Sequence, residues 1–384
     1  MRPAPAACGD PVAAIDTPAL VVDLDAFERN LRAMADFARA QGVKLRPHAK
    51  MHKCAAIALR QMALGAVGVC VQKTGEAEAL AAAGVSDVFV SNEVIAPAKL
   101  ARLAALAQRV RLAMTVDSAL GIDRLAQAVK GAGSTVDVFI EVDVGQGRCG
   151  VSPEQAAALA RQVAAQAPPR PGVDGAGLRL AGLQAYHGSA QHFRSAAERA
   201  AAIEQAVAIV SAARAAISAA GIDTPLLVTG AGSGTFMLEA GSGVYGELQP
   251  GSYAFLDADY ARNTPHPDAP RFEHALFVKA QVMSASTTHV VVDAGHKSHA
   301  IESGLPTVWQ REDLQVVGAN DEHCMLKPRG EGAALPALGD TLWLVPGHCD
   351  PTVNLHDHLI AVRGGLKRGV VEAVWTVDAR GRLD

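Results

Sequence analysis

The stretch Lys44-Leu45-Arg46-Pro47-His48-Ala49-Lys50-Met51-His52-Lys53 is a short predicted strand that runs into a crowded cationic end. Two lysines and two histidines follow directly after Arg46. Neighbouring positive charges disfavour one another's protonation, so the pattern predicts a lysine that is held partly neutral near pH 7. A neutral lysine amine forms a Schiff base with a carbonyl compound. The alternative is a solvated basic turn, because clusters of charge are often structural.

Outward from this stretch, short apolar strands alternate with amphipathic helices. This alternation implies parallel strands with helices on the outside. About eight such units over roughly 240 residues predict a (β/α)8 barrel, and an open doubly wound sheet is the alternative. Strands are expected at 17–24, 43–50, 68–72, 87–92, 111–117, 136–144, 180–187, 226–229 and 245–255. Helices are expected at 25–42, 54–63, 75–83, 96–107, 118–130, from 152 onward, and at 194–220.

After about residue 265 the pattern changes to apolar runs separated by turns. The runs at 275–282, 290–293, 341–346, 359–363 and 369–377 predict a mostly antiparallel β domain. The expected architecture is therefore a barrel over residues 22–265, and a β-rich domain that combines residues 1–21 with 266–384.

The composition excludes several classes of protein. With 49% hydrophobic and 19% charged residues among 384, the chain is globular, and a net charge of -4 gives no sign of a nucleic-acid surface. Residues 1–18 lack the apolar core of a signal peptide, and no uninterrupted apolar run reaches membrane-spanning length. The widely spaced cysteines favour reduced thiols in a cytoplasmic protein; they are Cys8, Cys54, Cys70, Cys149, Cys324 and Cys349.

Polar residues recur where the apolar runs end, which in a barrel is the face that carries active sites. Each is individually an ordinary loop residue, but their recurrence on successive strands favours a site. The run Gly230-Ala231-Gly232-Ser233-Gly234-Thr235 follows a strand and is a plausible phosphate cradle, although a glycine turn is the alternative. The other strand-end residues are Lys50, Gln72, Asn92, Asp117, Asp143, Tyr186 and His187.

A second candidate site lies near the C-terminus, in a predicted loop after a strand. If this segment is extended, His348 and Asp350 point to the same face while Cys349 points away. An imidazole beside a carboxylate is able to hold a divalent cation. A polar loop without a metal is the alternative.

The motif at residues 46–53 resembles the cofactor-lysine segment of the D-threonine aldolase and D-serine dehydratase family. Further similarity is found at residues 16–18, 91–93, 141–148 and around His348, so it covers nearly the whole chain. This resemblance implies an alanine-racemase-like barrel with a C-terminal β domain and pyridoxal 5'-phosphate bound to Lys50. It also implies a homodimer.

The resemblance further implies a role for each matching residue. Gly232, Ser233 and Gly234 match the phosphate loop, and Tyr253 is expected close to the cofactor. Arg148 matches a residue beside the phenolic oxygen of the cofactor, with Gln72 as its neighbour, and Tyr186 matches one that faces the pyridine nitrogen. His192 is the candidate base, and His348 with Asp350 is expected to bind Mn²⁺ or Mg²⁺, because the dehydratases have cysteine in place of the aspartate.

The function implied is retro-aldol cleavage of a D-β-hydroxy-α-amino acid, such as D-threonine, to glycine and an aldehyde. A 3-hydroxy-D-aspartate aldolase and a dehydratase of D-serine or D-threo-3-hydroxyaspartate are the alternatives within the family. A non-catalytic cofactor-binding barrel and a cofactor-free metal aldolase are the alternatives outside it. The expected partner is a small D-amino acid, with no nucleic acid and no membrane.

Overall fold

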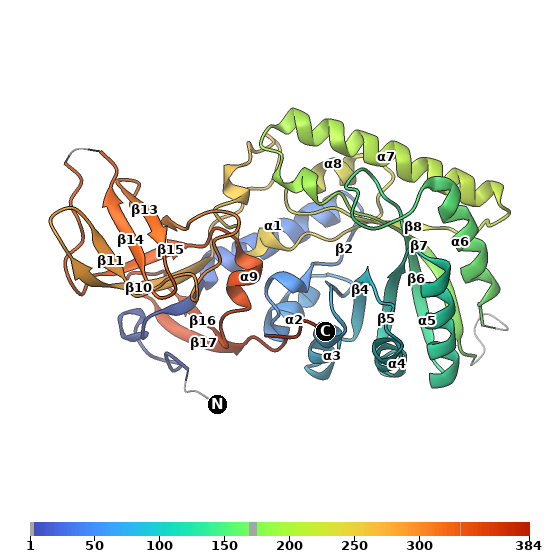
Figure 1. The fold of residues 1–384 in the computed structure, drawn as a ribbon, viewed down its shortest axis with the longest axis horizontal. Coiled ribbons are helices and arrows are strands. Elements are labelled where there is room, and N and C mark those ends of the chain that lie inside the picture. Colours follow the sequence, from blue (N-terminus) through green and yellow to red (C-terminus); the bar gives the residue numbers. More distant parts are fainter. Residues whose placement is uncertain (1–3, 169–174, 331) are drawn as a thin grey trace.

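The computed structural model describes residues 4–168, 175–330 and 332–384. It has two parts that lie side by side, a barrel with helices around it and a β-rich part (Figure 1). The chain passes between them through the long helix α1 (Leu24–Ala40). Asp23 caps this helix by accepting hydrogen bonds from the backbone N–H groups of Asp25 and Ala26.

The barrel consists of eight parallel strands in the order β2-β9-β8-β7-β6-β5-β4-β3. A parallel bridge between His48 and Cys70, together with the hydrogen bond from the Cys70 N–H to the Pro47 carbonyl, joins β2 to β3 and closes the ring. The structure is therefore a barrel and not an open sheet. Its strands are β2 (Lys44–Leu45), β3 (Val69–Val71), β4 (Asp87–Glu93), β5 (Arg111–Val116), β6 (Thr135–Glu141), β7 (Gly177–Ala185), β8 (Leu227–Gly230) and β9 (Glu247–Leu248).

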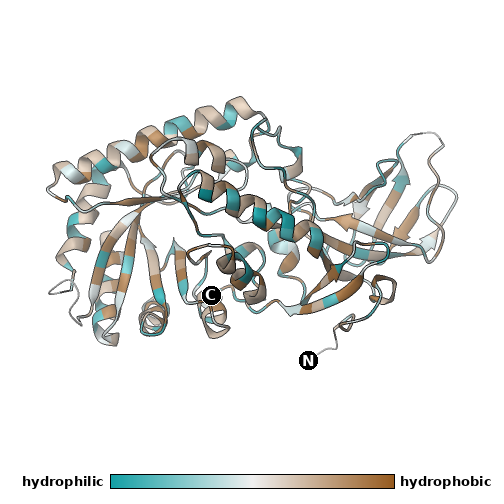
Figure 2. Cartoon of the chain, turned by 180° about the vertical axis from the view of Figure 1, so that it is seen from behind, coloured by the Kyte–Doolittle hydropathy of each residue, from teal (hydrophilic) through white to brown (hydrophobic). Residues whose placement is uncertain are grey.

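The barrel helices pack an apolar face against the outward side chains of these strands, as the 3.6-residue periodicity predicts. Figure 2 shows the strands of both parts largely in brown, whereas the helices mix apolar and polar residues. After α1 the helices are α2 (Ala55–Ala63), α3 (Thr74–Ala82), α4 (Pro97–Leu106), α5 (Ala119–Ala132), α6 (Pro153–Ala165), α7 (Ala196–Ala219) and α8 (Phe236–Gly241).

Within the described residues, α7 is the one helix that is long and apolar enough, by length and composition alone, to cross a membrane. Glu204 and Arg214 interrupt its apolar sequence, so the helix contains no uninterrupted apolar run of membrane-spanning length. In the structure α7 packs against α6 and buries a stripe of side chains that includes Ile203, Val210 and Ile217. A helix that packs on a protein core meets the same criterion as a membrane span.

The second part is built on a nine-stranded, mostly antiparallel sheet. The first strand of the chain, β1 (Ala19–Asp23), belongs to this sheet, where it pairs antiparallel with β10 and parallel with β16. The other strands are β10 (Leu276–Ala285), β11 (Val290–Val292), β12 (Thr307–Val308), β13 (Leu314–Ala319), β14 (Cys324–Pro328), β15 (Thr341–Val345), β16 (His358–Arg363) and β17 (Val370–Thr376). The helix α9 (Cys349–Val353) follows β15 and contacts the segment around Lys50, so this part reaches the mouth of the barrel.

Candidate active site

A cavity of about 240 Å³ opens at the carboxyl ends of the barrel strands, and Lys50 lies in its wall. Lys50 is in the short 3-10 helix Ala49–Met51 that follows β2. The cavity brings together most of the residues that the sequence singled out. Its lining includes Lys50, Gln72, Arg148, Tyr186, Gly232, Ser233 and Asp350, together with His48, Ser91, Gln184, Gln249, Gly251, Ser252 and Tyr260.

Lys50 forms an ion pair with Asp350, which comes from α9 in the other part of the molecule. Burial lowers the pKa of the Lys50 ammonium, but the Asp350 carboxylate more than offsets this, and the net pKa is raised. The expectation of a partly neutral lysine is therefore wrong for the chain without bound cofactor. Two of its neighbours in sequence add little positive charge around Lys50. Lys53 forms an ion pair with Glu76, and burial lowers the pKa of His52 to about 4.

His48 links the backbone of Lys50 to Gln72 and Ser91 through hydrogen bonds. Its Nδ1 accepts a hydrogen bond from the Lys50 backbone N–H (3.4 Å), and its Nε2 lies 3.0 Å from the Gln72 amide and 3.2 Å from the Ser91 hydroxyl. Burial, followed by the charge of Lys50, holds the pKa of His48 well below its usual range, so the ring is neutral. The motif contains His48, but no pattern in the sequence distinguished this buried histidine from a charged neighbour of the lysine.

Arg148 and Tyr186 face one another across the cavity wall, with the guanidinium carbon 5.8 Å from the centroid of the tyrosine ring. The loop that carries Arg148 is shaped by Asp143, whose Oδ1 accepts hydrogen bonds from the N–H groups of Gly145 and Gly147 (3.0 Å each). Burial raises the pKa of the Tyr186 phenol, which therefore remains a hydrogen-bond donor. Asp143, predicted only as a strand-end residue, thus holds the arginine loop in place.

The glycine loop after β8 places Gly232 and Ser233 at the cavity, whereas Gly234 faces away from it. The N–H of Gly234 donates to Gln191 Oε1 (2.9 Å), and Gln191 Nε2 donates to the Thr235 hydroxyl (2.8 Å). A Cβ on Gly232 would lie 2.4 Å from Gln191 Oε1, so any larger residue here would displace the Gln191 side chain that holds the loop. Gln191 is fully buried and fixes the loop, and no motif in the sequence indicates this role.

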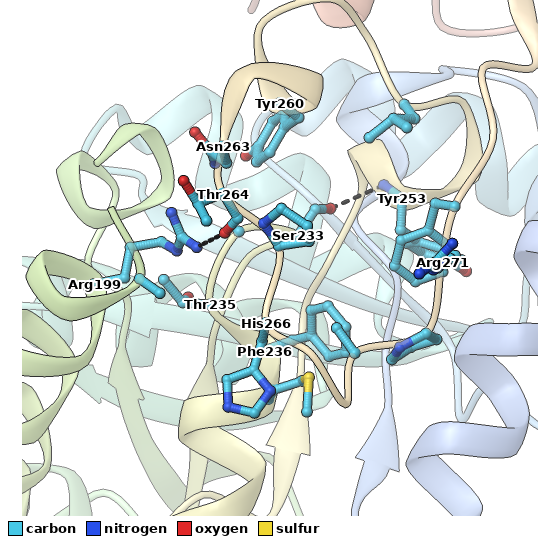
Figure 3. A pocket seen from close by; sticks show the side chains of 18 of the residues that line it. Arg199, Ser233, Thr235, Phe236, Tyr253, Tyr260, Asn263, Thr264, His266 and Arg271 are labelled. Atoms are coloured by element: carbon cyan, nitrogen blue, oxygen red, sulfur yellow. Dashed lines mark hydrogen bonds between the residues drawn. The ribbon is translucent and has the colours of Figure 1, made fainter. Parts of the chain in front are cut away.

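Tyr253 lies one layer behind the loop. Its backbone N–H donates to the Ser233 hydroxyl (2.9 Å), and its own hydroxyl accepts a hydrogen bond from Gln61 (3.1 Å). The ring borders a separate, larger hollow of about 560 Å³ that has Phe236 and Phe272 in its wall (Figure 3). Tyr253 therefore contacts the glycine loop, and its ring is not part of the smaller cavity's lining.

His192 is not part of the cavity lining, but its ring lies next to that of Tyr260, which is, with ring centroids 5.5 Å apart. Its Nδ1 is 2.6 Å from Asp259 Oδ2, and Asp259 also accepts hydrogen bonds from Arg194 and Arg262. Burial raises the pKa of Asp259, but the hydrogen bonds from Arg194 and His192 more than offset this, and the net pKa is lowered. Because an ionised carboxylate only accepts hydrogen bonds, His192 carries a proton on Nδ1 and presents Nε2 as the free position.

His348 and Asp350 come together at the start of α9. The segment turns into a helix at Cys349 and is not extended as expected, yet His348 Nε2 still lies 3.5 Å from Asp350 Oδ1, and Cys349 is buried on another side. Burial lowers the pKa of His348, but the carboxylates of Asp350 and Glu302 raise it to about 9. Asp350 Oδ1 is buried and has no hydrogen-bond partner among the described residues.

Comparison with known proteins identifies the family. Residues 22–259 match the family model "Alanine racemase, N-terminal domain", and residues 275–362 match "Putative serine dehydratase domain". The chain is 49% identical to a D-threonine aldolase from Arthrobacter sp, over 99% of this chain and 96% of that protein. The chain belongs to the D-threonine aldolase family, which depends on pyridoxal phosphate.

Other relatives and solved structures agree with this assignment. The crystal structure of D-threonine aldolase from Filomicrobium marinum superposes with a TM-score of 0.93 at 49% identity and covers all of both chains. A 3-hydroxy-D-aspartate aldolase from Paracoccus denitrificans (strain Pd 1222) is 43% identical over 98% of this chain and 95% of its own. The D-threo-3-hydroxyaspartate dehydratase from Delftia sp. HT23 superposes with a TM-score of 0.82 at 28% identity, covering 96% of this chain and 98% of that one.

The cavity fits the cofactor of the aldolase family. The backbone N–H groups of Gly232 and Ser233 donate to no other protein group in the described part of the chain, so both are available to an anion. Lys50 stands in the same cavity with its amine held only by an ion pair. An anion cradle and a lysine amine in one cavity are the two attachments that a phosphorylated aldehyde requires.

The pair His348 and Asp350 also fits a divalent cation. Once His348 has lost its Nε2 proton, the lone pair on this nitrogen faces Asp350 Oδ1 at 3.5 Å, and two acceptors at this separation fit a cation between them. No group of three or more His, Cys, Asp or Glu side chains among the described residues is arranged to hold a metal ion. A metal at this position would thus have two protein ligands and complete its coordination with water or substrate.

Proposed function

We propose that this protein cleaves D-β-hydroxy-α-amino acids between Cα and Cβ, with D-threonine giving glycine and acetaldehyde, and that it requires pyridoxal phosphate and Mn²⁺ or Mg²⁺. The observation that carries the proposal is the direct contact between Lys50 and Asp350. This contact supports the proposal because the proposed cofactor lysine lies beside a carboxylate suited to a hard cation, and both line one cavity. The similarity to D-threonine aldolases over the whole chain supports the choice of reaction.

The protein's own residues bind and orient the reactants. Lys50 would hold the cofactor, with Gly232 and Ser233 donating to its phosphate group, and Arg148 and Tyr186 fixing the ring. When bound, pyridoxal phosphate supplies an electron sink for the pair of electrons that the broken Cα–Cβ bond leaves on Cα. His348 and Asp350 would hold a divalent cation, and its positive charge would lower the pKa of the substrate hydroxyl.

His192 is the proposed acceptor for the proton of that hydroxyl. Asp259 binds its Nδ1, Nε2 has no hydrogen-bond partner among the described residues, and an imidazole is a suitable general base. The hydroxyl oxygen becomes the carbonyl oxygen of the released aldehyde, and a proton delivered to Cα completes glycine.

One assay separates this function from its alternatives. Purified protein is given D-threonine, D-3-hydroxyaspartate and an aryl analogue, with and without Mn²⁺, and glycine, ammonia and keto acid are measured. Glycine release that depends on Mn²⁺ is expected, and the best substrate distinguishes a D-threonine aldolase from a 3-hydroxy-D-aspartate aldolase. Ammonia with a keto acid would instead indicate a dehydratase, and glycine release that is unchanged after chelation would overturn the metal role. A homodimer in the cytoplasm, without nucleic-acid or membrane partners, remains our prediction.

A further inference from the structure

His348 has a second carboxylate partner on the side opposite Asp350. Glu302 Oε1 lies 2.5 Å from His348 Nδ1, and the hydroxyl of Ser303 lies 3.5 Å from the same nitrogen. Since a carboxylate accepts hydrogen bonds, the contact with Glu302 requires a proton on Nδ1. The neutral ring then has its lone pair on Nε2, which is the atom that faces Asp350 Oδ1.

The segment that carries Glu302 is attached to α9 by other hydrogen bonds. The N–H of Ala300 donates to the Thr352 hydroxyl (3.0 Å), and this hydroxyl donates to the carbonyl of His348 (2.7 Å). His356 Nε2 donates to the Ser298 carbonyl (2.7 Å), which ties the same segment to the residues after α9. Glu302 is therefore held opposite the ring by the fold, although its side chain is about half exposed.

We propose that Glu302 is a positioning residue that fixes the orientation and the tautomer of His348 for metal binding. This inference rests on the proposed function, because it assigns a role within the same metal site. Among the described residues, Glu302 bonds His348 and the neighbouring Ser303 hydroxyl and forms no hydrogen bond or ion pair with Lys50 or Asp350, so its role at the metal site would run through His348. A carboxylate on the second nitrogen of a metal-binding histidine orients the ring and increases its basicity.

The chain offers a matched control for this histidine–carboxylate pair. His296 Nε2 lies 2.9 Å from Asp321 Oδ1 at the other end of the same segment, and both side chains are exposed. Neither residue of this pair lines the cavity or belongs to α9. Exposed ion pairs contribute little on their own, so Asp321→Asn is expected to leave metal binding unchanged.

The test is a titration of cofactor-loaded, chelator-treated enzyme with Mn²⁺, in which electron paramagnetic resonance measures the concentration of free Mn²⁺. Glu302→Ala is expected to weaken Mn²⁺ binding by about 10- to 100-fold relative to Asp321→Asn. Saturating Mn²⁺ is expected to restore most of the turnover. Glu302→Gln, whose amide oxygen still accepts from Nδ1, should fall between the alanine variant and the wild type. The visible absorption of the bound cofactor and the thermal midpoint are measured alongside, and neither is expected to differ from the control.

The outcomes that overturn the inference are distinguishable from failure of the proposed function. If Glu302→Ala binds Mn²⁺ as tightly as Asp321→Asn does, Glu302 does not position the ligand, while the metal role is intact. If the wild type binds no Mn²⁺ at millimolar concentration, both the inference and the metal role are wrong. A weakened affinity accompanied by loss of cofactor absorption or of thermal stability would show a general structural defect, and it too would overturn the inference.

Discussion

Asp259 shows how one buried side chain sets the chemistry of another. It accepts hydrogen bonds from His192, Arg194 and Arg262, so two arginines compensate its charge while it holds the imidazole. The fixed tautomer leaves Nε2 of His192 without a proton and ready to accept one. The sequence shows no local motif that links Asp259 to the imidazole, because His192 and Arg194 come from a segment about 65 residues away.

Asp259→Asn is expected to lower kcat by about 10- to 100-fold while changing KM little. An asparagine side chain can donate to Nδ1, which would move the imidazole proton to Nε2 and occupy the position that accepts the substrate proton. Steady-state kinetics across a range of pH provides the measurement. Asp268→Asn is the control, since its exposed neighbour His266 is 3.9 Å away and takes no part in the site. Equal kcat values for the two variants would exclude the role of Asp259.

Replacing each partner of the Lys50–Asp350 ion pair is expected to have a different effect. Lys50→Ala is expected to abolish both the visible absorption of bound cofactor and the release of glycine, because no other amine is available in the cavity lining. Absorption and turnover that survive this substitution would mean that the cofactor is attached elsewhere.

Asp350→Ala is expected to retain the cofactor absorption but to lose the stimulation by Mn²⁺, since His348 alone is a weak ligand set. Asp357→Asn is the control in the same segment, because Asp357 forms an exposed ion pair with Arg380 and does not line the cavity. Mn²⁺ activation curves of both variants provide the measurement, and a wild-type curve for Asp350→Ala would contradict the assignment.

At this scale, sequence reasoning found residues that carry a charge or belong to a motif. Lys50, Gln72, Arg148, Tyr186, Ser233 and Asp350 were all predicted, and the structure places them around one cavity. Sequence reasoning did not identify Gln191, Asp259 and Glu302, which orient other residues through hydrogen bonds. Such contacts join distant segments and leave no local pattern. The prediction of a neutral lysine was wrong for the same reason, because the partner of Lys50, Asp350, is 300 residues away.

At the scale of elements, α8 connects the glycine loop to the interior. The Thr235 hydroxyl donates to Glu239 Oε1 (2.7 Å), and Glu239 is almost fully buried, with its Oε2 unpartnered among the described residues. Burial raises the pKa of Glu239 to about 7, against a usual value of 4.5. The folded protein therefore binds a proton at Glu239 between these two values, whereas the unfolded chain does not.

The sign of the pH dependence follows from this difference. Because the folded state binds more protons between pH 4.5 and about 7, the free energy of unfolding falls as pH rises through this range. The shift corresponds to about 3 kcal/mol at most. Glu239→Gln is expected to remove this loss and to be the more stable protein at pH 8. Urea unfolding at pH 5 and pH 8 checks this, and an unchanged difference between the two pH values in the variant would contradict it.

Elements of regular length were predictable, whereas very short ones were not. The buried strands β3 to β8 and the helices α2 to α7 follow the expected runs because burial imposes their periodicity. The strand β9 has two residues within an expected run of eleven, and the five-residue helix α9 and the strands β12 to β14 were missed. The two-residue strands β9 and β12 depend on pairing with β2 and β15, which are distant in the sequence, and local periodicity does not encode such pairing.

At the scale of the whole molecule, the barrel depends on how its two terminal strands meet. The seam between β2 and β3 is short, and Arg46 strengthens it by pairing with Asp87 of β4 and Glu247 of β9 inside the barrel. Charged groups this deep are stable only when paired, and removing one partner is strongly destabilising. The alternation in the sequence predicted the number of strands, but the choice between a closed barrel and an open sheet required this seam.

Gly68 lies at the seam and provides a test of closure. A Cβ at this position would lie 2.5 Å from the Asp87 carbonyl oxygen and 2.7 Å from the Arg46 guanidinium, so Gly68→Ala must displace the buried ion pair. The expected loss of stability is on the order of 1–3 kcal/mol. Gly131→Ala in α5 is the control, because its Cβ meets nothing within 4 Å and alanine favours the helix by about 0.5–1 kcal/mol. Urea unfolding of both variants measures the difference.

Since the segment after β2 carries Lys50, Gly68→Ala should also weaken cofactor retention during dialysis, whereas Gly131→Ala should not. Equal stability and equal retention would mean that closure of the ring does not hold the lysine in place.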